Sequence, residues 1–413
     1  MINITNNPEQ KKSVDNIIFL SDKINERAGG PSGYIANLQN GLTLFDDHSA
    51  KIAVVGDIYQ PQESRIKKSL LKLLTFWVPC KKWRRDLRSR LDSVLFEQAD
   101  KYAQYAKELD KYDFLSITCH TIDDVLFVRK YLNKRNLKAK LILMSHSPQP
   151  PSQETYDALL RQKNPDAEAI YRELAKKEKE AFYSEDIFLF PSKEAMEPYT
   201  SSLPYFDDII KQKVIKFVPT GCKPLHTDCS AEELRKRYQI TTPYVISYMG
   251  RHIPIKGYDL LKNIAKKLLS VRQDVTFLIG GRMQSGIPPL KHKNWVELGF
   301  VNPAEIFCVS DCFILPNRQT YFDLILLEAL SMGTVVFASD TGGNKTVYQQ
   351  TKAITLYTDE DDCVNKINRF LNASAEDRQK MKANAEKAYL ENYTPDIFGR
   401  NYVELIKEII KDV

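Results

Sequence analysis

Two cations stand close together where a predicted strand gives way to a predicted helix. The hydrophobic run 241–250 ends at Gly250, Arg251 follows at once, and Lys256 comes five residues later. Apolar residues at helical spacing then predict a helix over residues 258–271. In an open parallel sheet, ligands bind at the carboxyl ends of strands, where helix N-termini present free N–H groups. Because guanidinium and ammonium groups bind phosphate oxygens well, this turn predicts a diphosphate site.

One carboxylate lies in an otherwise apolar stretch further along the chain. Residues 315–345 predict a strand, a turn, a helix, a second strand and a glycine-rich turn, and Glu328 falls inside the helical sequence LILLEAL. A carboxylate among apolar residues is costly unless it has a partner. We therefore expect Glu328 to bind a pair of ligand hydroxyls.

Three stretches of the sequence resemble the C-terminal half of glycosyltransferase family 4. They are GRHIPIKGYDLL, LILLEALSMG and SDTGGNKTV, and the resemblance is dense over residues 244–347 and thinner before them. Members of that family are retaining enzymes of the GT-B fold that use nucleotide-sugar donors. The resemblance therefore implies an α/β protein with two doubly wound, Rossmann-like domains and a cleft between them.

The same resemblance assigns roles to individual residues. Arg251 and Lys256 would hold the donor diphosphate and stabilise it as it leaves, and Glu328 would hold the ribose. Further donor contacts map onto Gly250, Phe322, Asp323, Leu324, Gly342, Gly343 and Asn344. The implied donor is a nucleotide-diphosphate sugar, with UDP as the favoured nucleotide, and no cofactor is implied.

The sequence departs from the family pattern just before Glu328. Thr320 replaces the first Glu of the family's Glu-x7-Glu motif, and Asp323 replaces the usual glycine three residues later. A threonine is shorter and uncharged, so it cannot bind the same sugar hydroxyl as strongly. Asp323 could bring a carboxylate back to the sugar pocket, or it could cap the following helix, where an acid is favourable. If Asp323 is only a cap, sugar recognition falls to the glycine-rich turn.

Two features of the N-terminal half could face the same donor. Gly29, Gly30 and Gly33 precede a predicted helix, where a glycine loop either lets the backbone approach an anion or only turns the chain. His120 and His146 each follow a predicted strand, where a histidine is often structural. In the resembling family, a Gly-Gly loop faces the donor and a histidine faces the transferred sugar. We assign that catalytic histidine to His146, with His120 as the second candidate.

A length of 413 residues suits two domains. We place an N-terminal, acceptor-side domain at 1–217, a donor-binding domain at 218–392, and a final helix at 393–413 that returns to the first domain. No apolar run approaches the roughly 18 residues of a membrane span, so we expect a cytoplasmic protein. The seven cysteines predict reduced thiols, and Cys308 and Cys312 predict core positions rather than metal ligands.

Residues 65–90 are the most unusual segment in composition. They carry ten Lys or Arg and one acid, a local charge of +9 in a chain whose net charge is +6. Drawn as a helix, the first part aligns apolar residues opposite basic ones. Such a helix could lie peripherally on an anionic membrane, face the protein core, or form a contact in an oligomer. Nucleic acid is disfavoured because no recognised binding module accompanies the charge.

The acidic pairs do not predict a metal site. Asp123-Asp124 and Asp207-Asp208 are interpreted as solvated faces or helix starts, because neither follows a convincing strand. We therefore predict no obligatory metal.

The sequence as a whole predicts a retaining hexosyltransferase. It would move a hexose to a glycan, lipid-linked or protein acceptor in cell-surface polysaccharide or glycoconjugate assembly. The alternative is a non-catalytic, glycosyltransferase-like subunit that binds a partner enzyme or a glycan acceptor. Thr320 favours that alternative, whereas Arg251, Lys256 and Glu328 oppose it. A nucleotide-sugar epimerase of the same fold does not fit the Gly-Arg…Lys-Gly spacing.

Overall fold

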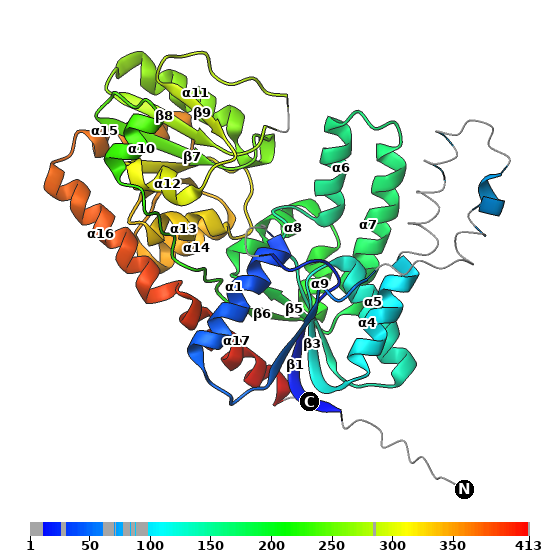
Figure 1. Cartoon of the computed structure of the whole chain (residues 1–413). Helices are drawn as coiled ribbons and strands as arrows, with labels where there is room; N and C mark the ends of the chain where they lie inside the picture. The colour runs from blue at the N-terminus through cyan, green and yellow to red at the C-terminus, as the bar shows by residue number, and fades with distance from the viewer. Residues whose placement is uncertain are drawn as a thin grey trace, which may run out of the picture.

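The protein consists of two α/β lobes, each built on one six-stranded parallel sheet (Figure 1). The computed structural model describes residues 11–25, 30–60, 70, 72–76, 83, 87, 98–283 and 286–411. Most of the basic segment 65–90, and Gly29, therefore lie outside the described residues. No helix that the structure describes is both long enough and apolar enough to span a bilayer.

The first sheet has the strand order β2-β1-β3-β4-β5-β6. Its inner strands are runs of apolar residues that are buried on both faces, as parallel sheets between helices require. The strands are β1 (Lys12–Leu20), β2 (Ile52–Gly56), β3 (Tyr112–Cys119), β4 (Lys140–Met144), β5 (Ile187–Phe190) and β6 (Val214–Phe217).

Two helices of the first lobe begin with an acidic pair. The acidic pairs Asp123-Asp124 and Asp207-Asp208 lie in the first turns of α5 and α9, so the prediction that they start helices is correct. The helical segments are α1 (Gly30–Phe45), α4 (Gln98–Leu109), α5 (Ile122–Arg135), α6 (Pro151–Arg161), α7 (Ala167–Ser184), η2 (Glu194–Met196), α8 (Glu197–Ser202) and α9 (Phe206–Gln212).

The second sheet has the strand order β12-β11-β10-β7-β8-β9. The order reverses between β7 and β10, which makes their carboxyl ends the usual ligand-binding edge of a doubly wound sheet. The strands are β7 (Tyr244–Met249), β8 (Val275–Gly280), β9 (Trp295–Gly299), β10 (Cys312–Leu315), β11 (Val335–Ser339) and β12 (Thr355–Tyr357).

The helices of the second lobe include the one predicted after the two cations. α11 covers the predicted residues and buries Leu261, Ile264 and Leu268, although Val271 at its end is 70% exposed. The helical segments are α10 (Ala231–Arg237), η3 (Pro254–Lys256), α11 (Tyr258–Val271), α12 (Pro303–Val309), α13 (Leu324–Ser331), α14 (Gly342–Thr351), α15 (Glu360–Leu371), α16 (Ala375–Asn392) and α17 (Pro395–Ile410).

The last helix, α17, lies beside α1 at the first lobe (Figure 1). The two helices approach closely at Gly41 and Gly399, where an added Cβ on Gly399 would lie 2.4 Å from the Gly41 backbone. Tyr402 donates its hydroxyl proton to Asn16 Oδ1 at 3.0 Å in β1. Backbone contact and a buried hydrogen bond therefore tie the C-terminal helix to the N-terminal sheet.

Candidate functional site

The turn that carries Arg251 and Lys256 is fixed by its own backbone geometry. Gly257 has φ +67°, and a Cβ at this position would lie 1.7 Å from the carbonyl oxygen of Pro316. Only glycine fits there, because other residues are strained at positive φ and would also collide. The buried Tyr248 donates its hydroxyl proton to the Arg251 carbonyl at 3.0 Å. The strand-to-helix turn is thus held in one conformation.

A second arginine clamps the same turn from outside. Arg318 donates to the carbonyl oxygen of Pro254 at 2.6 Å and to both carboxylate oxygens of Asp259 at 2.7 and 2.6 Å. The Arg318 guanidinium lowers the pKa of Asp259 below its usual value, so the pair stays charged near neutral pH. Arg318 therefore joins the loop after β10 to the loop after β7.

An aromatic layer lies beneath the turn. The His252 ring stacks on Tyr258 with centroids 4.0 Å apart. Glu297 accepts from the Tyr258 hydroxyl at 2.5 Å and from Trp295 Nε1 at 2.8 Å. Burial lowers the pKa of His252, which favours the neutral ring against Tyr258. Because His252 directly follows Arg251, this layer fixes the backbone next to Arg251.

Arg251 bonds a carboxylate of the other lobe. Arg251 Nη2 donates to Glu154 Oε1 at 3.1 Å, and Ser147 donates its hydroxyl proton to Glu154 Oε2. Glu154 belongs to the first turn of α6, in the segment that follows His146. The predicted diphosphate-binding arginine therefore holds an anionic group supplied by the chain itself.

Lys256 also bonds a carboxylate. Its Nζ donates to the two oxygens of Asp323 at 2.7 and 2.9 Å, and Asn317 Nδ2 donates to Asp323 as well. Asp323 occupies the N-cap position of α13, yet its side chain makes no capping hydrogen bond. Asp323 therefore stands at the helix start, as the capping alternative expects, but its carboxylate bonds Lys256 and Asn317 and makes no capping hydrogen bond.

Glu328 lies in the second turn of α13 and is partly buried. Burial raises its pKa from 4.5 to about 7, and none of the ion pairs between described residues includes it. A carboxylate held in this way is destabilising by itself, and perturbed carboxyl groups of this kind cluster at functional sites. Its state fits the expected role of binding hydroxyls.

The residues expected to contact the transferred sugar are mostly engaged within the protein. Thr320 is fully buried, and its hydroxyl has no hydrogen-bond partner among the residues that the structure describes. The Gly342 N–H donates to Glu197 at 3.0 Å, and Asn344 Nδ2 donates to the Ser339 carbonyl at 3.0 Å. Gly343 is packed against Tyr321 and Phe322, where a Cβ would lie 2.4 Å from the Tyr321 carbonyl oxygen. Sugar contacts from these residues remain a prediction.

The two predicted histidines form one pair. A hydrogen bond of 2.8 Å joins His120 Nδ1 to His146 Nε2, although the residues follow different strands. His120 is 3% exposed and His146 is partly exposed, so His146 is the member nearer the surface. Burial lowers the pKa of His120 to about 3 and lowers that of His146, so both rings are neutral at pH 7. Their order agrees with the assignment of His146 as the sugar-facing residue.

The glycine loop reaches the same place, but its position differs from expectation. α1 begins at Gly30, which has φ +66°, and Gly33 lies inside the first turn and is buried, so the two glycines do not precede the helix. Pro31 lies in the first turn, where its missing N–H costs no hydrogen bond and its fixed φ suits the helix. The Tyr34 ring then packs against the His146 ring in a tilted arrangement, with centroids 4.7 Å apart and an interplanar angle of 53°.

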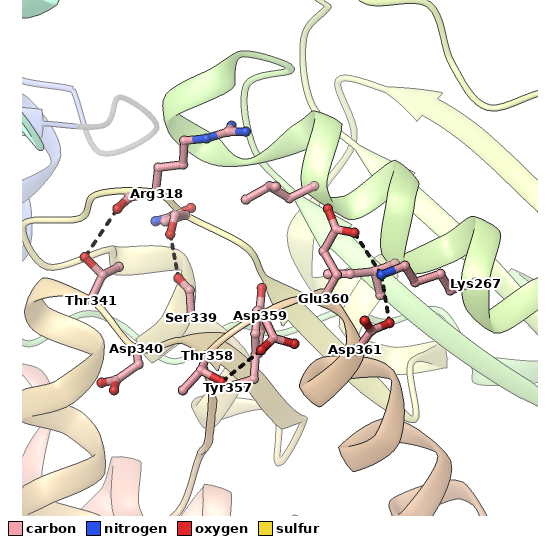
Figure 2. A pocket seen from close by; sticks show the side chains of 13 residues that line it. Lys267, Arg318, Ser339, Asp340, Thr341, Tyr357, Thr358, Asp359, Glu360 and Asp361 are labelled. Atoms are coloured by element: carbon pink, nitrogen blue, oxygen red, sulfur yellow. Dashed lines mark hydrogen bonds and ion pairs between the residues drawn. The ribbon is translucent and has the colours of Figure 1, made fainter.

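A cavity of about 520 Å³ lies at the carboxyl ends of β10, β11 and β12 (Figure 2). Its lining contains Arg318 but none of the predicted donor residues. Figure 2 shows Lys267 between Glu360 and Asp361, whose carboxylates it bonds at 3.2 and 2.7 Å. Four acids in the lining make this cavity unsuitable for a diphosphate. Among the described residues, no group of three or more His, Cys, Asp or Glu is placed to hold a metal ion.

A known protein family matches the part of the second lobe that contains the predicted donor site. Residues 243–373, which contain both cations, Asp323 and Glu328, match the family model described as Glycosyl transferases group 1. The matched segment thus includes the whole turn and α13.

Curated relatives share part of this domain. A phosphatidylinositol N-acetylglucosaminyltransferase subunit of Saccharomyces cerevisiae is 27% identical over 171 residues, which are 37% of each chain. A D-inositol 3-phosphate glycosyltransferase of Mycobacteroides abscessus is 31% identical over 113 residues, 24% of this chain and 25% of the relative. The alignments span well under half of the relatives they match.

Solved structures match the whole chain. A sucrose-phosphate synthase of Thermosynechococcus elongatus has a TM-score of 0.64 at 16% identity. The alignment covers 98% of this chain and 100% of the synthase chain. An Anabaena HepE protein, crystallised with UDP and glucose, has a TM-score of 0.61 at 13% identity. The alignment covers 95% of this chain and 99% of the HepE chain. These likenesses confirm the predicted GT-B fold.

Several residues of the site escaped the sequence analysis. Glu154, Glu197 and Asn317 bond predicted donor residues but belong to no recognised motif. The first two stand at helix starts next to proline, which gives their local structure but not their partners. Arg318 had a local signal, since it follows a buried strand at the same sheet edge as Arg251.

Replacing Glu328 by Gln should stabilise the protein in a pH-dependent way. The folded-state pKa is raised, so the wild type loses unfolding free energy as pH rises from about 4.5 to about 7. Glu328→Gln removes this loss and should be more stable than the wild type at pH 8 by about 1–3 kcal/mol, with little difference at pH 4.5. Urea unfolding at both pH values measures the difference. Glu376→Gln, on the exposed face of α16, is the control, and an equal offset at both pH values would contradict the assignment.

Proposed function

We propose that this protein transfers a hexose from a nucleotide-diphosphate sugar, a UDP-sugar in the first instance, to a glycan or lipid-linked acceptor. The observation that carries the proposal is the rigid turn that carries Arg251 and Lys256 and places Lys256 against Asp323 at the N-terminus of α13, one turn before Glu328. Guanidinium and ammonium groups suit a diphosphate, and the partly buried carboxylate suits a ribose. The relatives' names support transfer of a sugar in general.

The proposed chemistry is stabilisation of a leaving group. Charge develops on the diphosphate as the bond to the sugar breaks, and cations already fixed in place stabilise that charge without reorganising. We infer retention of configuration from the family resemblance, with attack from the face that the diphosphate leaves. The departing phosphate would then help to take the acceptor proton, and the neutral His146 would face the sugar. A metal is not required by this scheme.

The acceptor side of the proposal rests on the segment 65–90. Its described apolar side chains are exposed, including Leu73 at 64%, Phe76 at 69% and Trp83 at 70%. The exposure of these residues counts against the alternative of a core-facing helix. Exposed apolar residues among many cations suit the surface of an anionic membrane. We therefore propose peripheral membrane association on the cytoplasmic side, which would bring the cleft to a lipid-linked acceptor.

The alternative of a non-catalytic subunit has one structural argument in its favour. Both cations are paired with carboxylates of the chain, and Thr320 is buried where the family has a glutamate. However, the raised pKa of Glu328, a partly buried carboxylate in no ion pair between described residues, favours a ligand-binding role. Hydrolysis of a UDP-sugar by the purified chain separates the two functions, because only the enzyme turns over the donor.

Removing either cation should disable transfer. Arg251→Ala and Lys256→Ala should each lower donor turnover by at least about 10²-fold, the scale of losing a fixed charge contact to a developing anion. The measurement is release of nucleoside diphosphate from UDP-, GDP- and ADP-sugars, with circular dichroism to verify the fold. Lys266→Ala, an exposed lysine of α11, is the matched control. Turnover near that of the wild type in either variant would remove the proposed diphosphate site.

The membrane proposal predicts binding that depends on lipid charge. The protein should sediment with vesicles that contain anionic phospholipid and much less with neutral vesicles, and added salt should weaken the binding. Leu73→Ser combined with Phe76→Ser should reduce binding by about 10²-fold or more, because burying each large apolar side chain contributes about 1.5–3 kcal/mol. Leu390→Ser, an exposed leucine of α16, should change nothing. Equal sedimentation with both kinds of vesicle would show that the segment contacts protein instead.

A further inference from the structure

Two ion pairs between described residues cross from one lobe to the other, and both use acids of the first lobe. Glu154 of α6 bonds Arg251 at 3.1 Å, and Glu197 of α8 bonds Lys345 at 2.8 Å. Arg251 belongs to the loop after β7, and Lys345 belongs to the first turn of α14, which follows β11. The acids thus enter the cleft from one side and the cations from the other.

Each of these carboxylates is bound in the way that an anionic ligand would be bound. Glu154 accepts from a guanidinium and from the Ser147 hydroxyl. Glu197 accepts from Lys345 and from the N–H of Gly342, the first residue of α14. A lysine together with a helix N-terminus is a typical phosphate-binding arrangement. The first lobe therefore presents its own carboxylates to groups suited to hold an anion.

The charges of the turn are balanced while these contacts persist. Lys256 is neutralised within its own lobe by Asp323, and both side chains are only 16% exposed. Arg251 is the remaining cation of the turn, and Glu154 neutralises it. A diphosphate placed on Arg251 would stand beside the Glu154 carboxylate, and like charges at contact distance repel each other. Only one of the two anions, the Glu154 carboxylate or the diphosphate, can therefore bind Arg251 without repulsion from the other.

We propose that Glu154 is an internal competitor of the donor diphosphate, so that the Glu154–Arg251 contact between the lobes and donor binding exclude each other. The inference rests on the proposed donor site and adds how access to that site is controlled. Glu154 must leave Arg251 before the diphosphate binds, and since Glu154 lies on α6, its departure loosens the contact between the lobes. Donor binding and the loss of this contact between the lobes are thereby coupled, and the coupling acts in both directions.

Binding of UDP to purified full-length variants tests this competition. Glu154→Gln keeps the shape of the side chain and its contact with Ser147 but removes the competing charge. Isothermal titration at low ionic strength should show that UDP binds this variant about 1.5–5-fold more tightly than the wild type, the scale of a partly exposed ion pair. Glu168→Gln, which removes an exposed ion pair on α7 outside the cleft, should leave the affinity unchanged.

The same substitution in a second background shows whether the effect acts through Arg251. In an Arg251→Ala protein, Glu154→Gln should give no gain in UDP affinity, because the cation for which both anions compete is gone. Equal or weaker UDP binding by Glu154→Gln in the wild-type background would overturn the competition while leaving the donor site in place. If UDP binds neither the wild type nor Glu154→Gln, the donor site and the competition are both wrong.

Discussion

The central constraint on the cleft is that the two cations of the turn after β7 each need an anionic partner. The turn that carries Arg251 and Lys256 is fixed in one conformation by Gly257, which no other residue can replace, and by the hydrogen bonds of Arg318. Partly buried charges are costly unless an opposite charge is close. The chain supplies that charge twice, from Asp323 within the lobe and from Glu154 across the cleft. In the proposed competition, the anion that occupies Arg251 also determines whether the Glu154–Arg251 contact between the lobes is made.

The remaining features of the site can be understood as support for this turn and for α13. The layer of His252, Tyr258 and Glu297 carries the turn from below. On the facing lobe, the His120–His146 pair and Tyr34 form an aromatic wall in which both histidines stay neutral. Glu328 lowers stability as pH rises, which is the kind of cost that proteins bear where a ligand later satisfies the group. Stability is thus sacrificed at a place where binding could restore it.

Local features of the sequence predicted much of this arrangement. The strand-turn-helix around Arg251, the helix that carries Glu328 and the strand-end positions of both histidines follow from apolar periodicity and from the topology of parallel sheets. The family resemblance supplied the GT-B fold, which the solved structures confirm. Register and packing determine details that periodicity cannot, such as the early start of α1 at Gly30 and the exposure of Val271.

The partners of the predicted residues could not be predicted in the same way. Arg251 and Glu154 are 97 residues apart in the chain, and Lys256 and Asp323 are 67 apart. Asp323 was expected either to cap its helix or to bind sugar. The sequence shows that this acid stands at the start of a helix, but it does not show which cation its carboxylate contacts. Thr320 likewise gave no sign that its hydroxyl would be buried beneath the glycine-rich turn. Contacts of this kind depend on how two lobes meet.

A crystal structure of the protein bound to UDP tests the central claim most directly. The account predicts diphosphate oxygens within hydrogen-bonding distance of Arg251 and Lys256, the ribose hydroxyls at Glu328, and a Glu154 carboxylate that has left Arg251. A diphosphate bound elsewhere, or bound at Arg251 while the Glu154–Arg251 contact is retained, would contradict it.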